Sequence, residues 1–211
     1  MRLVFASNNA HKLSEVRAMM PAGVEVLSLH EIGFEAEIDE TGETLEENSL
    51  IKAKTVWEWM NGENGDASLN GGLMIDGVFA DDTGLEIDAL NGEPGVYTAR
   101  WAGSPAANRA KALRELEGKD NRGCQFRTVI TLLMNGDAPL NGRMMQVEGV
   151  VRGRIAEQEY GEGGFGYDPV FIPEGYDKTF GELPAELKNH ISHRARAIQE
   201  LVKVLNEGMK E

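Results

Sequence analysis

Four segments combine residue types that could bind or cleave a phosphorylated ligand. The first contains Ser7, Asn8, Asn9 and Lys12. It lies where an apolar run at residues 2–6 gives way to a helical pattern at 11–20, and ligands of open α/β sheets bind at such strand ends. The N–H groups of a helix start and the charge of Lys12 would favour an anion. The alternative is that Asn9 caps the helix and Lys12 is solvated.

The second segment places two adjacent carboxylates, Asp81 and Asp82, after an apolar run and before Thr83. Buried carboxylates are costly unless they bind something. In a strand the two side chains point to opposite faces, so one can face a ligand while the other is held from behind. A carboxylate that faces a ligand can bind Mg²⁺ or activate water, and Glu40 could be a further metal ligand. The alternatives are a turn at 81–84 and a solvated acidic loop around Glu40.

The third segment, residues 163–171, surrounds Phe165 with three glycines. Glycine lets the backbone approach a ligand closely, and a ring on such a loop can stack on a base. Gly166 and Tyr167 belong to the same loop, and Asp168 can accept hydrogen bonds from ring N–H groups. The alternative is a tight hairpin with Phe165 in the core.

The fourth segment contains Lys188, Ser192, His193 and Arg194. Arginine has only donors, so Arg194 can bind a carbonyl oxygen but cannot accept from an amino group. That property would separate a 6-oxo purine from adenine. The alternative is an exposed basic face of a helix.

Composition excludes several classes of function. The 211 residues carry a net charge of −14, which disfavours binding to nucleic acid or anionic membranes. There is no apolar run long enough to span a membrane and no pattern of a signal peptide, so a cytoplasmic protein is expected. Cys124 is the single cysteine and is expected to be packed rather than nucleophilic. No Cys or His cluster has the spacing of zinc ligands.

The elements expected around these segments indicate an α/β fold. Strands are expected at 2–6, 24–29, 74–80, 85–90, 126–134 and 144–155. Helices are expected at 11–20, 44–60, 105–116 and 184–206, with a capping box from Thr44 to Glu47. Residues 61–72 and 135–142 are expected to be loops.

The order of the four segments, together with residues 47–53 and 92–103, resembles the inosine/xanthosine triphosphate pyrophosphatase family over almost the whole chain. The resemblance implies one domain, residues 1–211, with a mixed sheet flanked by helices in two lobes and a deep cleft between them. It also implies Mg²⁺, a homodimer, and hydrolysis of ITP, dITP or XTP to the monophosphate and pyrophosphate. Residues 61–72 look longer than the family loop, and Ser7 stands where Thr is common.

The resemblance also implies a role for each site residue. Asp82 would be the general base and a metal ligand with Glu40, while Asp81 would support it and Lys12 would act in catalysis. The remaining residues would bind substrate: Ser7, Asn8, Asn9, Lys12, Thr83, Phe165, Gly166, Tyr167, Asp168, Lys188, His193 and Arg194. Two alternatives stay open, namely a pyrophosphatase for modified pyrimidine nucleotides and a nucleotide sensor without catalysis.

Overall fold

The computed structural model describes residues 1–62, 74–135 and 143–208. Most of the expected loop at 61–72, and residues 136–142 of the second loop, lie outside this range. The elements are, in chain order, β1 (Arg2–Phe5), α1 (Ala10–Met19), β2 (Glu25–Leu27), α2 (Leu45–Asn61), β3 (Gly77–Ile87), η1 (Asp88–Leu90), β4 (Pro94–Gly95), α3 (Pro105–Glu115), β5 (Gly123–Met134), β6 (Met144–Ile155), β7 (Phe171–Pro173), α4 (Ala185–Ile191) and α5 (His193–Gly208). Within the described ranges, no helix is both long and apolar enough to cross a membrane.

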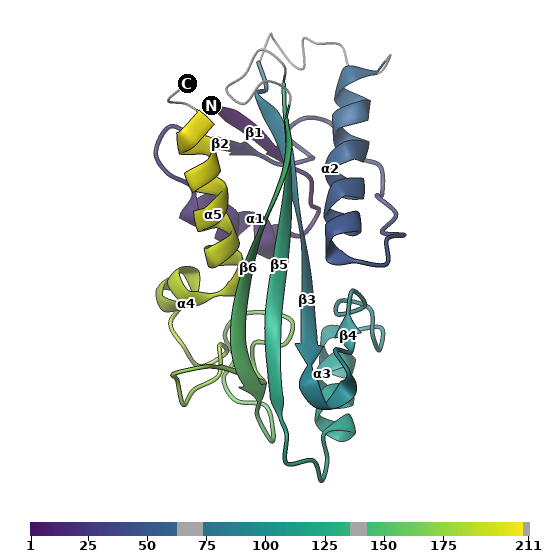
Figure 1. Ribbon diagram of the computed structural model, residues 1–211, viewed down its shortest axis with the longest axis vertical. Coiled ribbons are helices and arrows are strands. Elements are labelled where there is room, and N and C mark those ends of the chain that lie inside the picture. The colour runs from purple at the N-terminus through teal and green to yellow at the C-terminus, as the bar shows by residue number, and fades with distance from the viewer. Residues whose placement is uncertain (63–73, 136–142, 209–211) are drawn as a thin grey trace. The chain divides into compact units, whose positions relative to one another are not determined.

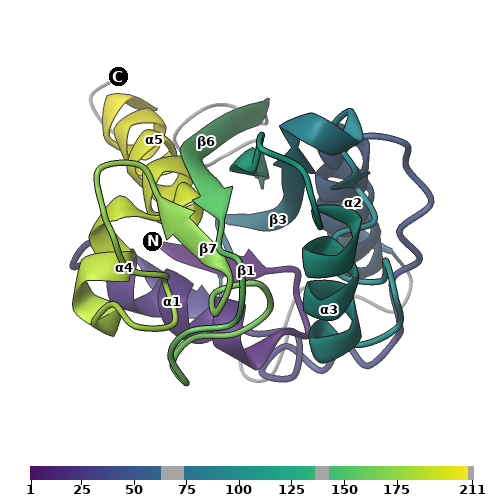
Figure 2. The same ribbon diagram turned by 90° about the horizontal axis from the view of Figure 1, so that it is seen from below.

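The strands form one mixed sheet in the order β2-β1-β3-β5-β6-β7, with β4 on β3. Strand β1 runs parallel to both β2 and β3. The short strand β4 is antiparallel to β3, and β7 is antiparallel to β6 beside it (Figure 2). The predicted α/β class with a mixed sheet and flanking helices is confirmed.

The chain forms two compact units. Unit 1 comprises Met1–Asp82, Val129–Glu148 and Ala197–Glu211. Unit 2 comprises Thr83–Thr128 and Gly149–Arg196. The boundary between Asp82 and Thr83 divides the predicted site residues between the two units.

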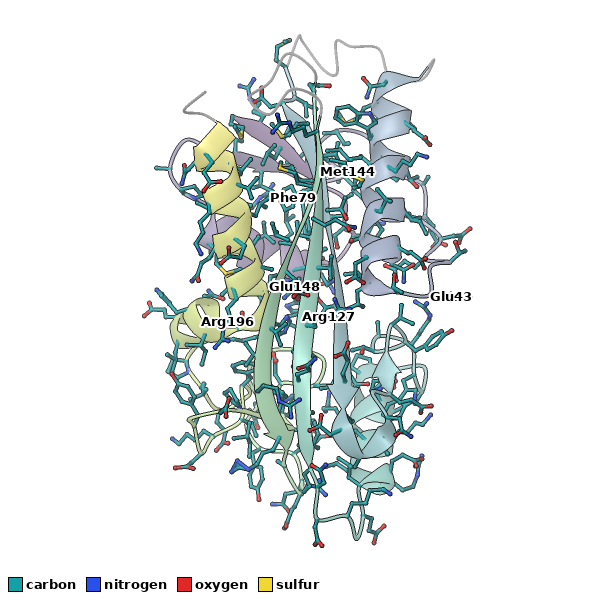
Figure 3. All side chains as sticks on the ribbon, in the orientation of Figure 1. Glu43, Phe79, Arg127, Met144, Glu148 and Arg196 are labelled. Carbon is teal, nitrogen blue, oxygen red and sulfur yellow. The ribbon has the colours of Figure 1, made fainter. Side chains whose placement is uncertain are left out.

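Unit 1 has a core on each face of its strands, because the side chains of β1 alternate. Leu3 and Phe5 pack with α1 and α5, and Phe5 stacks on Phe79 of β3 with ring centroids 5.0 Å apart. Figure 3 labels Phe79. Val4 and Ala6 pack on the other face with α2. These helices lie on opposite sides of β1 in Figure 1. Burial of both faces explains the continuous apolar run of β1.

Unit 2 has a separate core made by β3, β5, β6, β7 and α3. Its aromatic centre is Phe126, whose ring meets those of Phe171 and Tyr167 edge to face at 4.8 and 6.3 Å. Helix α3 contributes Ala112, with Leu116 just after its last turn.

The alternative of a turn at 81–84 is wrong. The expected strands at 74–80 and 85–90 are joined, because β3 continues through residues 81–84. Asp and Gly are depleted in strands, which is why propensity predicts an interruption. Here Asp81 and Asp82 each contact a lysine, so both carboxylates are accommodated inside the strand. Residues 88–90 form a short 3₁₀ helix rather than strand.

The predicted single helix at 184–206 is also wrong, because it is broken at Ser192. The backbone of Ser192 is extended, with φ −67° and ψ 159°. Its hydroxyl accepts a hydrogen bond from the N–H of Ala195 at 3.1 Å, as an N-cap does. His193 and Arg194 therefore begin a new helix, α5, instead of continuing α4.

Candidate active site

The start of α1 is built around Asn9. Its side-chain oxygen accepts from the N–H groups of His11 and Lys12 at 3.0 and 3.1 Å, so Asn9 is the N-cap. Ser7 accepts from the N–H of Asn9 at 3.3 Å, and Asn8 is exposed. The capping role considered for Asn9 is thus confirmed.

Lys12 is directed inward, and the expectation of a solvated side chain is wrong. Its Nζ atom lies 2.9 Å from Oδ1 of Asp81. The side chain of Asp81 is 1% exposed and that of Lys12 is 16% exposed. Asp81 therefore holds a cation from the first turn of α1 beside the middle of β3.

Asp82, the next residue, contacts a different cation. Nζ of Lys52 lies 2.8 Å from Oδ1 of Asp82 and 2.8 Å from Oε1 of Glu40. Helix α2 supplies Lys52, and its capping box from Thr44 to Glu47 is present as predicted. One buried ammonium group thus joins the two acids that the sequence proposes as metal ligands.

The loop that carries Glu40 is fixed to the same helix. The N–H of Gly42 donates to Oδ1 of Asn48 at 2.8 Å. A β-carbon at position 42 would lie 2.7 Å from the side chain of Glu47, so only glycine allows this approach. Helix α2 therefore positions both Lys52 and Glu40.

Burial controls the protonation of this cluster. It raises the pKa of Asp82 above its ordinary value, although Lys52 and Lys12 oppose the shift. Burial would lower the pKa of Lys52, but the charges of Asp82 and Glu40 outweigh it, and that pKa is raised. Asp82 thus combines a raised proton affinity with a neighbouring cation, as a general base requires. Its second oxygen, Oδ2, is buried and has no hydrogen-bond partner among the described residues.

A second cluster, in unit 2, surrounds the half-buried ring of Phe165. Oδ2 of Asp168 accepts from the N–H of Phe165 and from Nζ of Lys188, both at 2.7 Å. Nζ of Lys188 lies 4.7 Å from the centroid of the Phe165 ring, and the guanidinium of Arg194 lies 5.9 Å from it. Asp168 thus fixes the loop and orients one of two cations beside an aromatic ring.

Hydrogen bonds of Arg109 and Tyr167 hold the rest of the glycine-rich loop in place. Arg109 of α3 donates to the carbonyl of Gly166 at 2.8 Å. Tyr167 points into the core of unit 2, and its hydroxyl donates to the carbonyl of Thr98 at 3.1 Å. Burial raises the pKa of Tyr167 well above its ordinary range. Tyr167 therefore supports the loop from inside the unit.

Two residues of the clusters were not singled out from the sequence. Lys52 belongs to the segment 47–53, and its position four residues after Asn48 on α2 could have indicated a shared face. Thr128 is fully buried on β5 and contacts both Thr83 and His193. Cys124 is packed as predicted, and burial raises the pKa of its thiol to about 12, so it is no nucleophile.

Comparisons with known proteins show which family this chain belongs to. The chain matches the family model described as the Ham1 family over residues 3–204. It is 45% identical to the dITP/XTP pyrophosphatase of Flavobacterium johnsoniae, covering 97% of this chain and 98% of the relative. For the dITP/XTP pyrophosphatase of Bacillus subtilis the identity is 43%, covering 96% of each chain.

Solved structures give the same result. The Staphylococcus aureus Ham1 protein has a TM-score of 0.78 and 37% identity, covering 98% of this chain and 99% of that one. A HAM1 protein from Coxiella burnetii has a TM-score of 0.82 and 33% identity, with the same coverage. Sequence, fold and family model therefore agree that this chain belongs to the Ham1 family.

Proposed function

We propose that this chain hydrolyses the purine nucleoside triphosphates ITP, dITP and XTP to the monophosphate and pyrophosphate, with Mg²⁺. The names of the relatives support this substrate class. The observation that carries the chemistry is Asp82, a buried carboxylate with a raised pKa and one oxygen that has no hydrogen-bond partner among the described residues. A carboxylate with raised proton affinity can take a proton from water.

The acids of unit 1 fit a magnesium ion. Within the described ranges the buried Oδ2 atom of Asp82 has no hydrogen-bond partner, and Glu40 shares the ammonium group of Lys52 with Asp82. No three His, Cys, Asp or Glu side chains converge on a possible metal position in the part of the chain that the structure describes. Two carboxylates suffice for Mg²⁺, which commonly takes its other ligands from substrate phosphates and water. When bound, it would neutralise charge on the phosphates.

In the proposed reaction, Asp82 removes a proton from a water molecule, whose oxygen forms a bond to the α-phosphorus. The bond from that phosphorus to the oxygen bridging the α- and β-phosphates breaks, and pyrophosphate leaves with this oxygen. Lys12, held by Asp81, supplies positive charge for the triphosphate. Positioning and charge neutralisation provide most of the acceleration in phosphoryl transfer of this kind.

The cluster of unit 2 has the chemistry to recognise a 6-oxo purine. Phe165 offers a ring for stacking, and Lys188 and Arg194 offer donors only. A carbonyl oxygen on the base satisfies such donors, whereas the amino group of adenine leaves them unpaired. In a well-built site this mismatch is worth on the order of 10⁴-fold in discrimination.

The proposal is tested with purified protein, Mg²⁺ and a panel of ITP, XTP, GTP and ATP, by following pyrophosphate and orthophosphate separately. Pyrophosphate from ITP and XTP, with little from ATP, is the expected result. Modified pyrimidine triphosphates are assayed beside this panel. Turnover of these alone would support the pyrimidine alternative, and binding without any product would support the sensor. The homodimer implied by the resemblance and the cytoplasmic location expected from the sequence stay predictions, and size-exclusion chromatography with light scattering tests the first.

A further inference from the structure

We propose that Thr128 is a positioning residue that holds His193 in the tautomer with its proton on Nε2. Thr128 lies on β5 and is completely buried. Its Oγ1 atom is 2.6 Å from Nδ1 of His193 and 2.8 Å from Oγ1 of Thr83. The three side chains belong to unit 2 and form a short hydrogen-bonded chain.

The direction of this chain follows from Arg194 at its end. Among the described residues, Oγ1 of Thr83 has two partners, Thr128 and, at 3.5 Å, Nη2 of Arg194. Because a guanidinium only donates, Thr128 is the one described acceptor for the hydroxyl proton of Thr83, and the arrangement that pairs this proton sends it to Thr128. Thr128 then gives its own single proton to Nδ1 of His193. With Nδ1 as an acceptor, the neutral ring carries its proton on Nε2.

Packing fixes the plane of the same ring. Phe126 lies two residues before Thr128 and therefore on the same face of β5. Its ring stacks on that of His193 with centroids 4.7 Å apart and planes inclined by 27°. His193 is 6% exposed, and Phe126 is itself held by Phe171. Stacking restrains the plane of the imidazole but does not choose which nitrogen carries the proton. The hydrogen bond from Thr128 to Nδ1 determines that the proton lies on Nε2.

The consequence for specificity rests on the proposed function. If the cluster of unit 2 binds the base, a protonated Nε2 makes His193 a third donor beside Lys188 and Arg194. A donor matches a 6-oxo group and not the amino group of adenine. Thr128, which touches no reacting atom, would then contribute to selectivity through His193.

The inference is tested first on the free wild-type enzyme, by nitrogen NMR of labelled histidine at about pH 8.5, where imidazole is neutral. Comparison with His193→Gln identifies the signals of His193. The expected spectrum has a protonated Nε2 and an unprotonated Nδ1. A protonated Nδ1 would overturn the inference, and this measurement needs no variant of Thr128.

Three variants provide the second test. Thr128→Val should shift the Nδ1 signal of His193, raise KM for ITP, and lower the preference for ITP over ATP on the order of 10-fold, the usual effect of losing one buried hydrogen bond. Because Thr128 does not contact the reacting atoms, kcat for ITP should change little. Thr128→Ser restores the hydroxyl and should restore the Nδ1 signal, KM and the ITP preference. Thr131→Val is the matched control, since Thr131 is an equally buried threonine of β5 whose partners are Ser49, at 2.7 Å, and Gln146, at 2.9 Å.

The outcomes separate the inference from the proposed function. An unchanged His193 spectrum in Thr128→Val would overturn the inference. A shifted spectrum with an unchanged ITP preference would support the tautomer assignment and count against the role of unit 2 in base binding. The same spectral shift in Thr131→Val would show a general effect of losing a buried hydroxyl from β5. That result would also overturn the inference about Thr128.

Discussion

Replacement of Lys52 by methionine probes the link between charge and stability in unit 1. Methionine keeps much of the unbranched stem and removes the ammonium group that contacts Asp82 and Glu40, each at 2.8 Å. The side chains of Lys52 and Asp82 are 8% and 9% exposed, so water cannot replace the lost cation easily. Lys52→Met therefore leaves a buried carboxylate without its nearest counter-charge.

The distance sets the scale of the effect. Two unit charges 2.8 Å apart attract by about 6 kcal/mol at an effective dielectric constant of about 20. Removal of the lysine also removes the cost of burying an ammonium group, which offsets part of this loss. Breaking a buried ion pair from one side costs about 3–5 kcal/mol, and we expect a loss of that size in the free energy of unfolding at about pH 8.

The loss should depend on pH because Asp82 can become neutral. Burial raises the pKa of Asp82, and removal of Lys52 raises it further. A carboxyl group with a raised pKa in the folded state contributes stability that is complete below its unfolded pKa of about 3.9 and is lost as pH rises through the folded pKa. The cost of Lys52→Met should therefore be smaller at acid pH than at alkaline pH, and grow as pH rises.

Urea unfolding of both proteins at several pH values measures this cost. Lys54→Met is the matched control, because Lys54 lies on the same helix with a side chain that is 62% exposed, and its change should stay within about 0.5 kcal/mol. A loss below about 1 kcal/mol, or one that is the same at about pH 5 and about pH 8, would refute the reasoning. Lys52→Met should also move the acid limb of the pH–rate profile to higher pH, because it raises the pKa of Asp82.

Two further predictions concern turnover and the glycine-rich loop. Asp82→Asn should fold, as circular dichroism would show, and lose about 10²–10⁴-fold in kcat, the usual contribution of a general base; near-normal kcat would remove Asp82 from that role. Gly164→Ala should raise KM for ITP, because φ is +73° there and the new β-carbon would collide with Asp168. Gly166→Ala is the control for backbone strain alone, since φ is +61° but no atom lies within 4 Å of the added carbon; equal KM values in the two variants would contradict the role of Asp168.

The sequence predicts those elements whose determinants are local. Helix α2 begins at its predicted capping box, and α1 begins beside its predicted cap Asn9. Two departures from the expected elements have different causes, tertiary contacts in β3 and a local cap at α5. Strand β3 continues through Asp81 and Asp82 because lysines from α1 and α2 neutralise them, and α5 begins at a capping serine, Ser192, that the apolar stripe of the helix does not reveal.

The sequence predicts many of the residues of the candidate site but few of the contacts between them. Spacing alone cannot show that Lys52 joins Glu40 to Asp82, because the two acids are 42 residues apart in the sequence. Thr128 lies in an apolar strand, and its hydroxyl becomes informative only when Thr83 and His193 are seen on either side of it. Tyr167 belongs to the expected substrate loop, yet its side chain packs in the core of unit 2. The deep cleft implied by the resemblance stays a prediction.

The central claim is that water attacks the α-phosphorus of a 6-oxo purine triphosphate. It is tested most directly by letting the enzyme hydrolyse ITP with Mg²⁺ in water labelled with heavy oxygen, and by locating the label in the products by mass spectrometry. The account predicts label in the monophosphate and none in pyrophosphate. Label in pyrophosphate would place the attack on the β-phosphorus, and labelled orthophosphate would place it on the γ-phosphorus; either result would contradict the proposed reaction.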